Sequence, residues 1–70
     1  MISGRQCRAA RAWLGWSQWE LVRETTVYRQ KVIAFEKEEG LDAENQKKIH
    51  DRLILAGVTL QKDGSISLEH

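Results

Sequence analysis

The sequence contains no proline and only one cysteine among its 70 residues. A single cysteine cannot form a disulfide within the chain, which excludes a disulfide-bonded framework. The uninterrupted apolar runs are too short to cross a bilayer, and the first residues lack the basic segment and apolar stretch of an export signal. We therefore expect a protein of the reducing cytoplasm that has no membrane partner.

Side chains suited to catalysis or metal binding are also scarce. The two histidines, His50 and His70, have no partners at the spacing of metal ligands, and Cys7 stands alone. The sequence has no serine–histidine–acid set, no glycine-rich phosphate loop and no convergent pair of carboxylates. We expect no enzymatic activity, no metal and no cofactor.

The charges that are present are unevenly distributed. The net charge is only +1, with 11 basic and 10 acidic side chains. Residues 1–37 hold seven of the basic and three of the acidic side chains, whereas residues 38–70 hold four and seven. A positive half beside a negative half is what a phosphate-binding face requires.

Local signals predict two closely spaced helices in the first part of the chain. The first covers residues 4–14, and Gly15 can adopt the left-handed conformation that ends a helix. Ser17 and Glu20 then form the capping-box pattern, which predicts a second helix over residues 18–25.

Two further helices are predicted from apolar residues at helical spacing. The third covers residues 28–37, and its buried side is formed by Val27, Val32 and Phe35. The fourth covers residues 43–56, between an aspartate that can cap its start and a glycine that can end it.

The apolar period changes to two after residue 57, which predicts a β-hairpin. A two-residue loop at 63–64 would mix polar and apolar side chains on each face. A three-residue loop at 62–64 gives apolar pairs instead: Leu60 with Ile66, and Val58 with Leu68. We predict the three-residue loop, with Gly64 left-handed. An isolated hairpin is marginal in water, so it must pack on the helices or on another copy of the chain.

These elements predict an all-α fold class with four helices and a short C-terminal β-hairpin. Seventy residues allow one small domain, close to the size at which one hydrophobic core just suffices. We expect residues 1–57 to form the helical domain and residues 58–67 the hairpin. Residues 68–70, Leu-Glu-His, match the start of a cloning tag.

Residues 16–40 read WSQWELVRETTVYRQKVIAFEKEEG. This segment resembles the helix-turn-helix of Cro/repressor-type (XRE-like) transcriptional regulators, and the resemblance extends over the first helix and loosely over the fourth. The matching positions are Gln18, Glu20, Leu21, Val27, Val32, Phe35 and Glu36. The resemblance implies a four-helix repressor-like domain and a structural ion pair between Arg11 and Glu36.

The resemblance also implies a sequence-specific transcriptional regulator that lays the third helix in the major groove of double-stranded DNA. Carried over by position, the base-contacting candidates are Tyr28, Arg29, Gln30, Lys31 and Ala34. The phosphate-contacting candidates are Gln18, Arg23 and Lys37. One reading helix covers only a half-site, so a homodimer is expected.

Several positions depart from the family pattern. Thr26 stands where the family usually has a glycine, and Tyr28 stands where a serine or threonine commonly caps the third helix. Large apolar groups, Trp19, Tyr28 and Ile33, occupy the face that would meet DNA, as expected of a protein interface. Together with Val22 they would form the anchor patch of such an interface. Two interpretations stay open: a divergent DNA-binding regulator, or a helix-turn-helix scaffold whose face has been altered, for example by engineering, to bind a protein.

Overall fold

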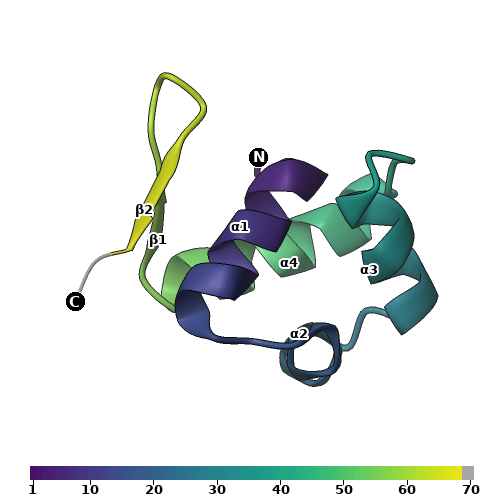
Figure 1. The fold of residues 1–70 in the computed structure, drawn as a ribbon. Coiled ribbons are helices and arrows are strands. Elements are labelled where there is room, and N and C mark those ends of the chain that lie inside the picture. Colours follow the sequence, from purple (N-terminus) through teal and green to yellow (C-terminus); the bar gives the residue numbers. More distant parts are fainter. Residues whose placement is uncertain (69–70) are drawn as a thin grey trace.

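The computed structural model describes residues 1–68 and contains, over that range, four helices followed by a two-stranded antiparallel hairpin (Figure 1). The elements are α1 (Gly4–Leu14), α2 (Gln18–Thr25), α3 (Arg29–Glu36), α4 (Ala43–Leu55), β1 (Val58–Leu60) and β2 (Ile66–Leu68). The predicted mostly α-helical fold and the order of its elements are confirmed. The third and fourth helices are slightly shorter than predicted, because Tyr28, Lys37 and Ala56 are caps.

Side chains close to the helix ends explain where α1 and α2 begin. Ser3 accepts a hydrogen bond from the backbone N–H of Gln6, whose side chain accepts one from the N–H of Ser3 in return. Gly15 ends α1 in the left-handed conformation, with φ of 71°. Ser17 caps α2 by accepting from the N–H of Glu20. The Glu20 carboxylate contacts the Ser17 hydroxyl at 3.5 Å rather than the backbone, so only half of the predicted capping box forms.

The core lies where α1, α2, α3, α4 and β1 meet. It is formed by ten buried side chains: Ile2, Cys7, Ala10, Leu21, Val27, Val32, Phe35, Ile49, Leu53 and Val58. The helical periodicity predicts most of these positions. Ile2 lies outside any helix, and α4 holds its backbone through two hydrogen bonds: its N–H donates to His50 Nδ1, and its carbonyl accepts from Gln46 Nε2.

The connection between α2 and α3 keeps a left-handed residue where the family pattern has glycine. Thr26 adopts φ of 60° and ends α2 by donating its N–H to the carbonyl of Val22. Thr25 is buried, and its hydroxyl bonds to Leu21 and to the N–H of Val27. No side chain caps α3, since Tyr28 at its N-cap makes no such bond. The turn is therefore strained, and α3 lacks a cap worth about 1 kcal/mol.

Replacing Thr26 with glycine is expected to raise the free energy of unfolding by about 0.5–1 kcal/mol. A left-handed non-glycine residue costs about 1–2 kcal/mol, and the greater freedom of glycine in the unfolded chain offsets part of the gain. Urea denaturation followed by circular dichroism measures the change. Thr59→Gly is the control, because Thr59 lies in β1 without a positive φ and should lose stability. An equal loss in both variants would contradict the strain at Thr26.

The hairpin has the predicted register and loop. Leu60 pairs with Ile66 and Val58 with Leu68, and Gly64 is left-handed with φ of 89°. Gln6 of α1 donates its side-chain amide to the carbonyl of Gly64, so the hairpin packs on the helices. It stands at the end of the molecule opposite α3 (Figure 1). Leu68 of the predicted tag remnant is part of β2, and residues 69–70 lie outside the described residues.

Candidate nucleic-acid interface

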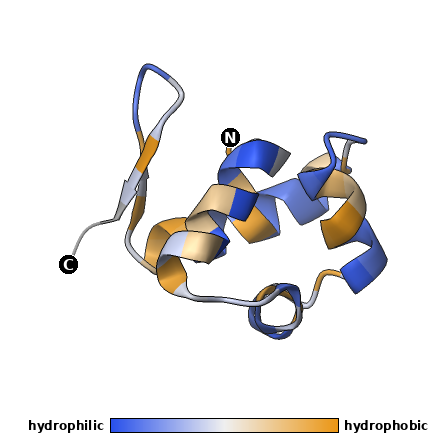
Figure 2. Ribbon diagram, viewed as in Figure 1, coloured by the Kyte–Doolittle hydropathy of each residue, from blue (hydrophilic) through white to orange (hydrophobic). Residues whose placement is uncertain are grey.

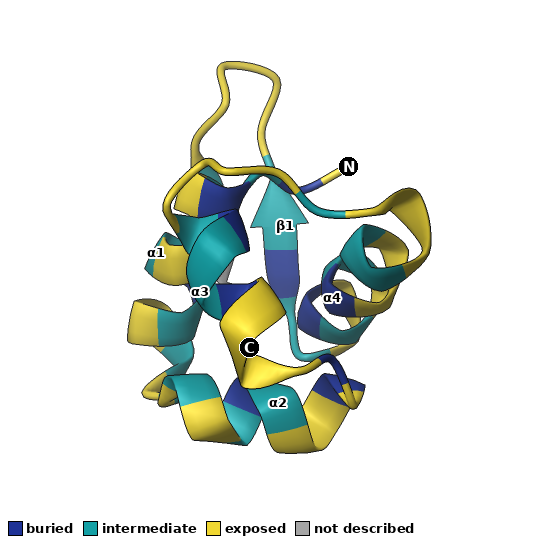
Figure 3. Ribbon diagram, turned by 90° about the vertical axis from the view of Figure 1, so that its right-hand side faces the viewer, coloured by how far each residue is buried: buried dark blue, intermediate teal, exposed yellow. Residues whose placement is uncertain are grey.

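The residues assigned to base contacts lie at the start of α3 and along its outer side. Residues 29–31 form the first turn and are exposed, whereas Val32 and Phe35 beneath them are buried. The start of α3 is coloured hydrophilic in Figure 2, and exposed residues line the outer sides of α2 and α3 in Figure 3. The fold therefore presents three consecutive polar side chains to solvent over an apolar underside.

Arg29, the first residue of α3, is stacked on Trp19 of α2. Its guanidinium carbon lies 4.9 Å from the centroid of the Trp19 ring, which is the geometry of a cation–π interaction. Trp19 is 63% exposed, so the pair lies on the surface. No sequence pattern predicts this contact, because the chain changes direction between the two residues.

Lys31 and Ala34 have a partly acidic environment. The Nζ of Lys31 lies 3.5 Å from Oδ1 of Asp42, and both side chains are about half exposed. Lys31 and Ala34 also border a surface hollow of about 470 Å³ that Glu39 and Asp42 help to line. The negative charges of Asp42 and Glu39 partly offset the positive charge of Lys31. Arg29 is therefore the stronger candidate for contact with an acceptor on a partner.

The three phosphate candidates differ in how freely they project. Arg23 and Lys37 are exposed, and neither forms an ion pair with any of residues 1–68. Gln18 is only partly exposed, and its side-chain amide donates to Oε1 of Glu36 over 3.4 Å. Arg23 and Lys37 are thus available to a phosphate, whereas the Gln18 side chain is already engaged inside the protein.

Arg8 is a basic residue of this region that the sequence analysis did not select. With Lys37 and Gln18 it borders a hollow of about 290 Å³ where α1, α2 and α3 meet. Its spacing of three residues from Arg11 places both arginines on one side of α1. The spacing in the sequence thus indicates that Arg8 lies on the same side as Arg11, but only the fold shows that this side of α1 adjoins α3.

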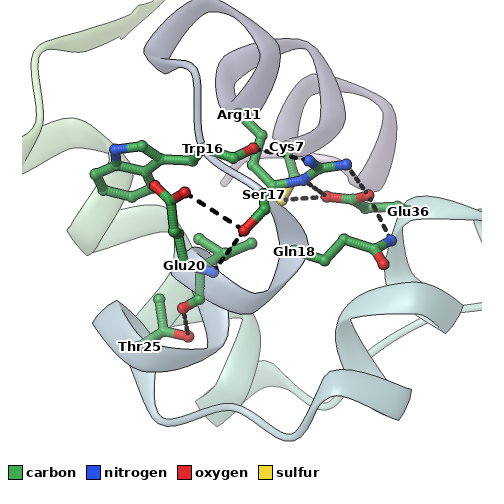
Figure 4. A network of polar contacts seen from close by, with 9 residues as sticks. Cys7, Arg11, Trp16, Ser17, Gln18, Glu20, Thr25 and Glu36 are labelled. Carbon is green, nitrogen blue, oxygen red and sulfur yellow. Dashed lines mark hydrogen bonds and ion pairs between the residues drawn. The ribbon is translucent and has the colours of Figure 1, made fainter.

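The ion pair between Arg11 and Glu36 is present beneath this surface (Figure 4). Arg11 Nε and Nη2 donate to Oε2 and Oε1 of Glu36 over 2.8 and 2.9 Å. Gln18 and the thiol of Cys7 also donate to the same carboxylate, and Arg11 Nη1 donates to the backbone carbonyl of Trp16. The Glu36 side chain is only 5% exposed. The network joins α1, α2 and α3 around a carboxylate that is removed from water.

This environment shifts the pKa of each ionisable group in the network. Burial raises the pKa of the Cys7 thiol, and the charge of Glu36 raises it further. Burial also acts to raise the pKa of Glu36, but the hydrogen bonds and charge of Arg11 outweigh it, so this pKa lies below its ordinary value of 4.5. Hydrogen bonding to Glu36 raises the pKa of Arg11. Arg11 and Glu36 are therefore both charged at neutral pH, and the Cys7 thiol is protonated.

The lowered pKa of Glu36 predicts a loss of stability in acid. Because the folded pKa is below the unfolded value, the stabilisation is complete above pH 4.5 and is lost as the pH falls through the folded pKa. The free energy of unfolding, measured by urea denaturation between neutral pH and pH 3, should fall more steeply below pH 4.5 in the unaltered protein than in Glu36→Gln. Exposed Asp42 and Asp63 also have lowered pKa values, but they titrate in both proteins. Parallel curves would contradict this role of Glu36.

The apolar residues considered as a protein interface are not equally exposed. Trp19 and Tyr28 are 63% and 75% exposed, whereas Val22 and Ile33 are partly buried. Val22 packs against the core, and Ile33 lines the hollow beside Lys37. Arg29 covers one face of Trp19. The exposed apolar surface is therefore smaller than the four residues suggested.

Comparison with known proteins adds no relative. No protein-family model, no curated protein and no solved structure matches this chain. Within residues 1–68, no group of three His, Cys, Asp or Glu side chains is placed to hold a metal ion. In the same range no helix combines the length and apolar character needed to cross a membrane.

Proposed function

We propose that this protein is a sequence-specific DNA-binding regulator in which α2 and α3 form a repressor-like helix-turn-helix. The observation that carries this proposal is the arrangement of α3. Its first turn, residues 29–31, projects polar side chains that match the acceptors and donors of base edges, and Val32 and Phe35 anchor the opposite side in the core. An α-helix with its side chains is about 10–12 Å in diameter, which suits the width of the major groove.

The distribution of unpaired basic residues supports contact with phosphates. Arg8, Arg23, Arg29 and Lys37 come from α1, α2 and α3, and none of them is in an ion pair within the described part of the chain. Elsewhere in residues 1–68, Lys47 and Arg52 of α4 pair with Asp51 and Glu24, whereas Lys48 and Lys62 form no ion pair. Positive charge that no acidic side chain balances favours a polyanionic partner on the α2–α3 side.

A homodimer belongs to this proposal, because one α3 reads only half of a site. The C-terminal end of α4 and the adjoining hairpin are the candidate contact. Leu55 is 79% exposed and Ile54 is 41% exposed at this end of α4. Two large apolar side chains in consecutive positions on the surface are consistent with a second copy packing there.

Titration of random-sequence duplex DNA at two salt concentrations tests the proposal. We expect salt-sensitive binding, because phosphate contacts release counterions, and a complex with two chains per duplex in analytical ultracentrifugation. Lys37→Gln should reduce the slope of log K against log salt by about one. Lys62→Gln removes one exposed charge from the hairpin loop, outside α1, α2 and α3, and should leave the slope unchanged. The absence of binding, or binding insensitive to salt, would rule out a DNA-binding role.

Binding to a protein partner is the second candidate function, and the exposure of Trp19 and Tyr28 favours it. Exposed aromatic side chains are frequent hot spots of protein interfaces. The partial burial of Val22 and Ile33 leaves a small patch, so DNA binding has the stronger support. Two results together would favour this second function. The unaltered protein would fail to bind duplex DNA, and Trp19→Ala would abolish a protein complex while the variant stays folded.

A further inference from the structure

Trp19 is placed in a way that packing does not explain. A large aromatic side chain that stays 63% exposed contributes little to the core. Its ring nevertheless contacts the guanidinium of Arg29, which comes from the next helix and lies 4.9 Å from the ring centroid. A cation–π pair at such an exposed site adds only about 0.5–1 kcal/mol to stability.

A second arginine in the same protein shows what a stacked guanidinium can do. Arg52 lies 5.2 Å from the centroid of the Trp16 ring, and its Nε donates to Oε1 of Glu24 over 2.9 Å. Its Nη2 also bonds to that oxygen. Stacking covers the flat face of a guanidinium and leaves the N–H groups along its edge free to donate. In Arg52 a carboxylate of the chain occupies that edge.

Arg29 has the same stacking but no such acceptor within residues 1–68, where it forms no ion pair and no side-chain hydrogen bond. Lys31, two residues later, is by contrast paired with Asp42. A guanidinium held over a ring loses less conformational freedom when it binds, because the ring already restricts it. The N–H groups along the edge of Arg29 are therefore free to donate to an acceptor from outside these residues.

We propose that Trp19 is a positioning residue that holds Arg29 for bidentate hydrogen bonding to a guanine in the major groove. This inference rests on the proposed DNA-binding function. Guanine presents two acceptors, O6 and N7, on its major-groove edge, and paired N–H groups of arginine match that pair. Arg29 opens α3, at the end of the helix that enters the groove in this mode of binding. Trp19 thereby contributes to DNA reading instead of opposing it.

The test begins with selection of a preferred duplex from a random library by the unaltered protein. The probes are that duplex, the same duplex with 7-deazaguanine at each guanine in turn, and a random duplex. Arg29→Lys keeps the charge but loses the bidentate fork, so we expect about a tenfold or greater loss on the selected duplex and little change on the random one. Trp19→Ala should lose several-fold in the same selective way, and Trp19→Phe, which keeps an aromatic face, should lose less.

The 7-deazaguanine series identifies the contact. At one guanine the substitution should weaken binding by the unaltered protein but add no further loss in Arg29→Lys, because the N7 contact is then already missing. Equal losses on selected and random duplexes would instead assign Arg29 to a phosphate and overturn the inference. The inference is also overturned if Trp19→Ala leaves the guanine preference intact.

A measurement without DNA tests the stack separately. The side-chain NMR signals of Arg29 should be displaced by the ring current of Trp19, and the displacement should disappear in Trp19→Ala. Helix content and thermal midpoint should stay close to those of the unaltered protein, since the side chain is mostly exposed. Absence of the displacement, with duplex binding intact, overturns the positioning role alone. Absence of salt-sensitive duplex binding by the unaltered protein overturns the proposed function, and the guanine contact with it.

Discussion

Arg11→Met should lower the free energy of unfolding by about 3–5 kcal/mol, because it leaves the carboxylate of Glu36 buried without its cation. The Glu36 side chain is 5% exposed and receives two of its hydrogen bonds from Arg11. The bonds from Gln18 and Cys7 would remain, but both are longer and neither donor carries a charge. The variant would also lose the bond from Arg11 to the carbonyl of Trp16, which holds the α1–α2 connection. Guanidinium denaturation followed by circular dichroism measures the loss.

Two further variants separate this effect from the loss of any ion pair. Lys47→Met removes an exposed pair with Asp51 and should cost less than about 0.5 kcal/mol. The double variant Arg11→Met with Glu36→Leu removes both charges, and it should recover much of the stability lost in the single variant. If Arg11→Met costs no more than Lys47→Met, the buried pair does not hold the three helices together.

Gly4→Ala should lower the free energy of unfolding by about 3 kcal/mol through steric overlap. A Cβ atom at this position would lie 1.7 Å from the backbone carbonyl oxygen of Phe35 and 2.6 Å from its carbonyl carbon. Backbone atoms cannot rotate away as a flexible side chain can, so α1 and α3 would have to move apart. Helix propensity alone predicts the opposite sign, since alanine is favoured over glycine in a helix by about 1 kcal/mol.

Gly15→Ala is the matched control for this prediction. No atom lies within 4 Å of a Cβ at Gly15, so Gly15→Ala causes no steric overlap. Its only cost is that alanine must adopt the left-handed φ of 71°, which lowers the free energy of unfolding by about 1–2 kcal/mol. Urea denaturation of both variants should therefore show the larger loss in Gly4→Ala. A Gly4→Ala variant as stable as the unaltered protein would contradict the close approach of α1 to α3.

Features that depend on neighbouring residues in the chain were predictable. The N-caps at Ser3, Ser17 and Asp42 and the left-handed stop at Gly15 use hydrogen bonds within one or two helical turns. The register of the hairpin followed from its period of two and from the loop length at Gly64. The predicted reciprocal bond, from the Ser17 N–H to the Glu20 carboxylate, was wrong, because that carboxylate accepts from the Ser17 hydroxyl instead.

For the candidate interface, sequence alone specified which side chains are polar and which side of α3 is apolar, because a helical period depends only on residue order. Tertiary structure decided which of these side chains are free. The crossing of α2 and α3 places Trp19 under Arg29, and the fold beyond α3 brings Asp42 to Lys31. It also engages Gln18 with Glu36. Such contacts join separate elements, and their distances depend on how the helices pack around the core, which no local pattern encodes.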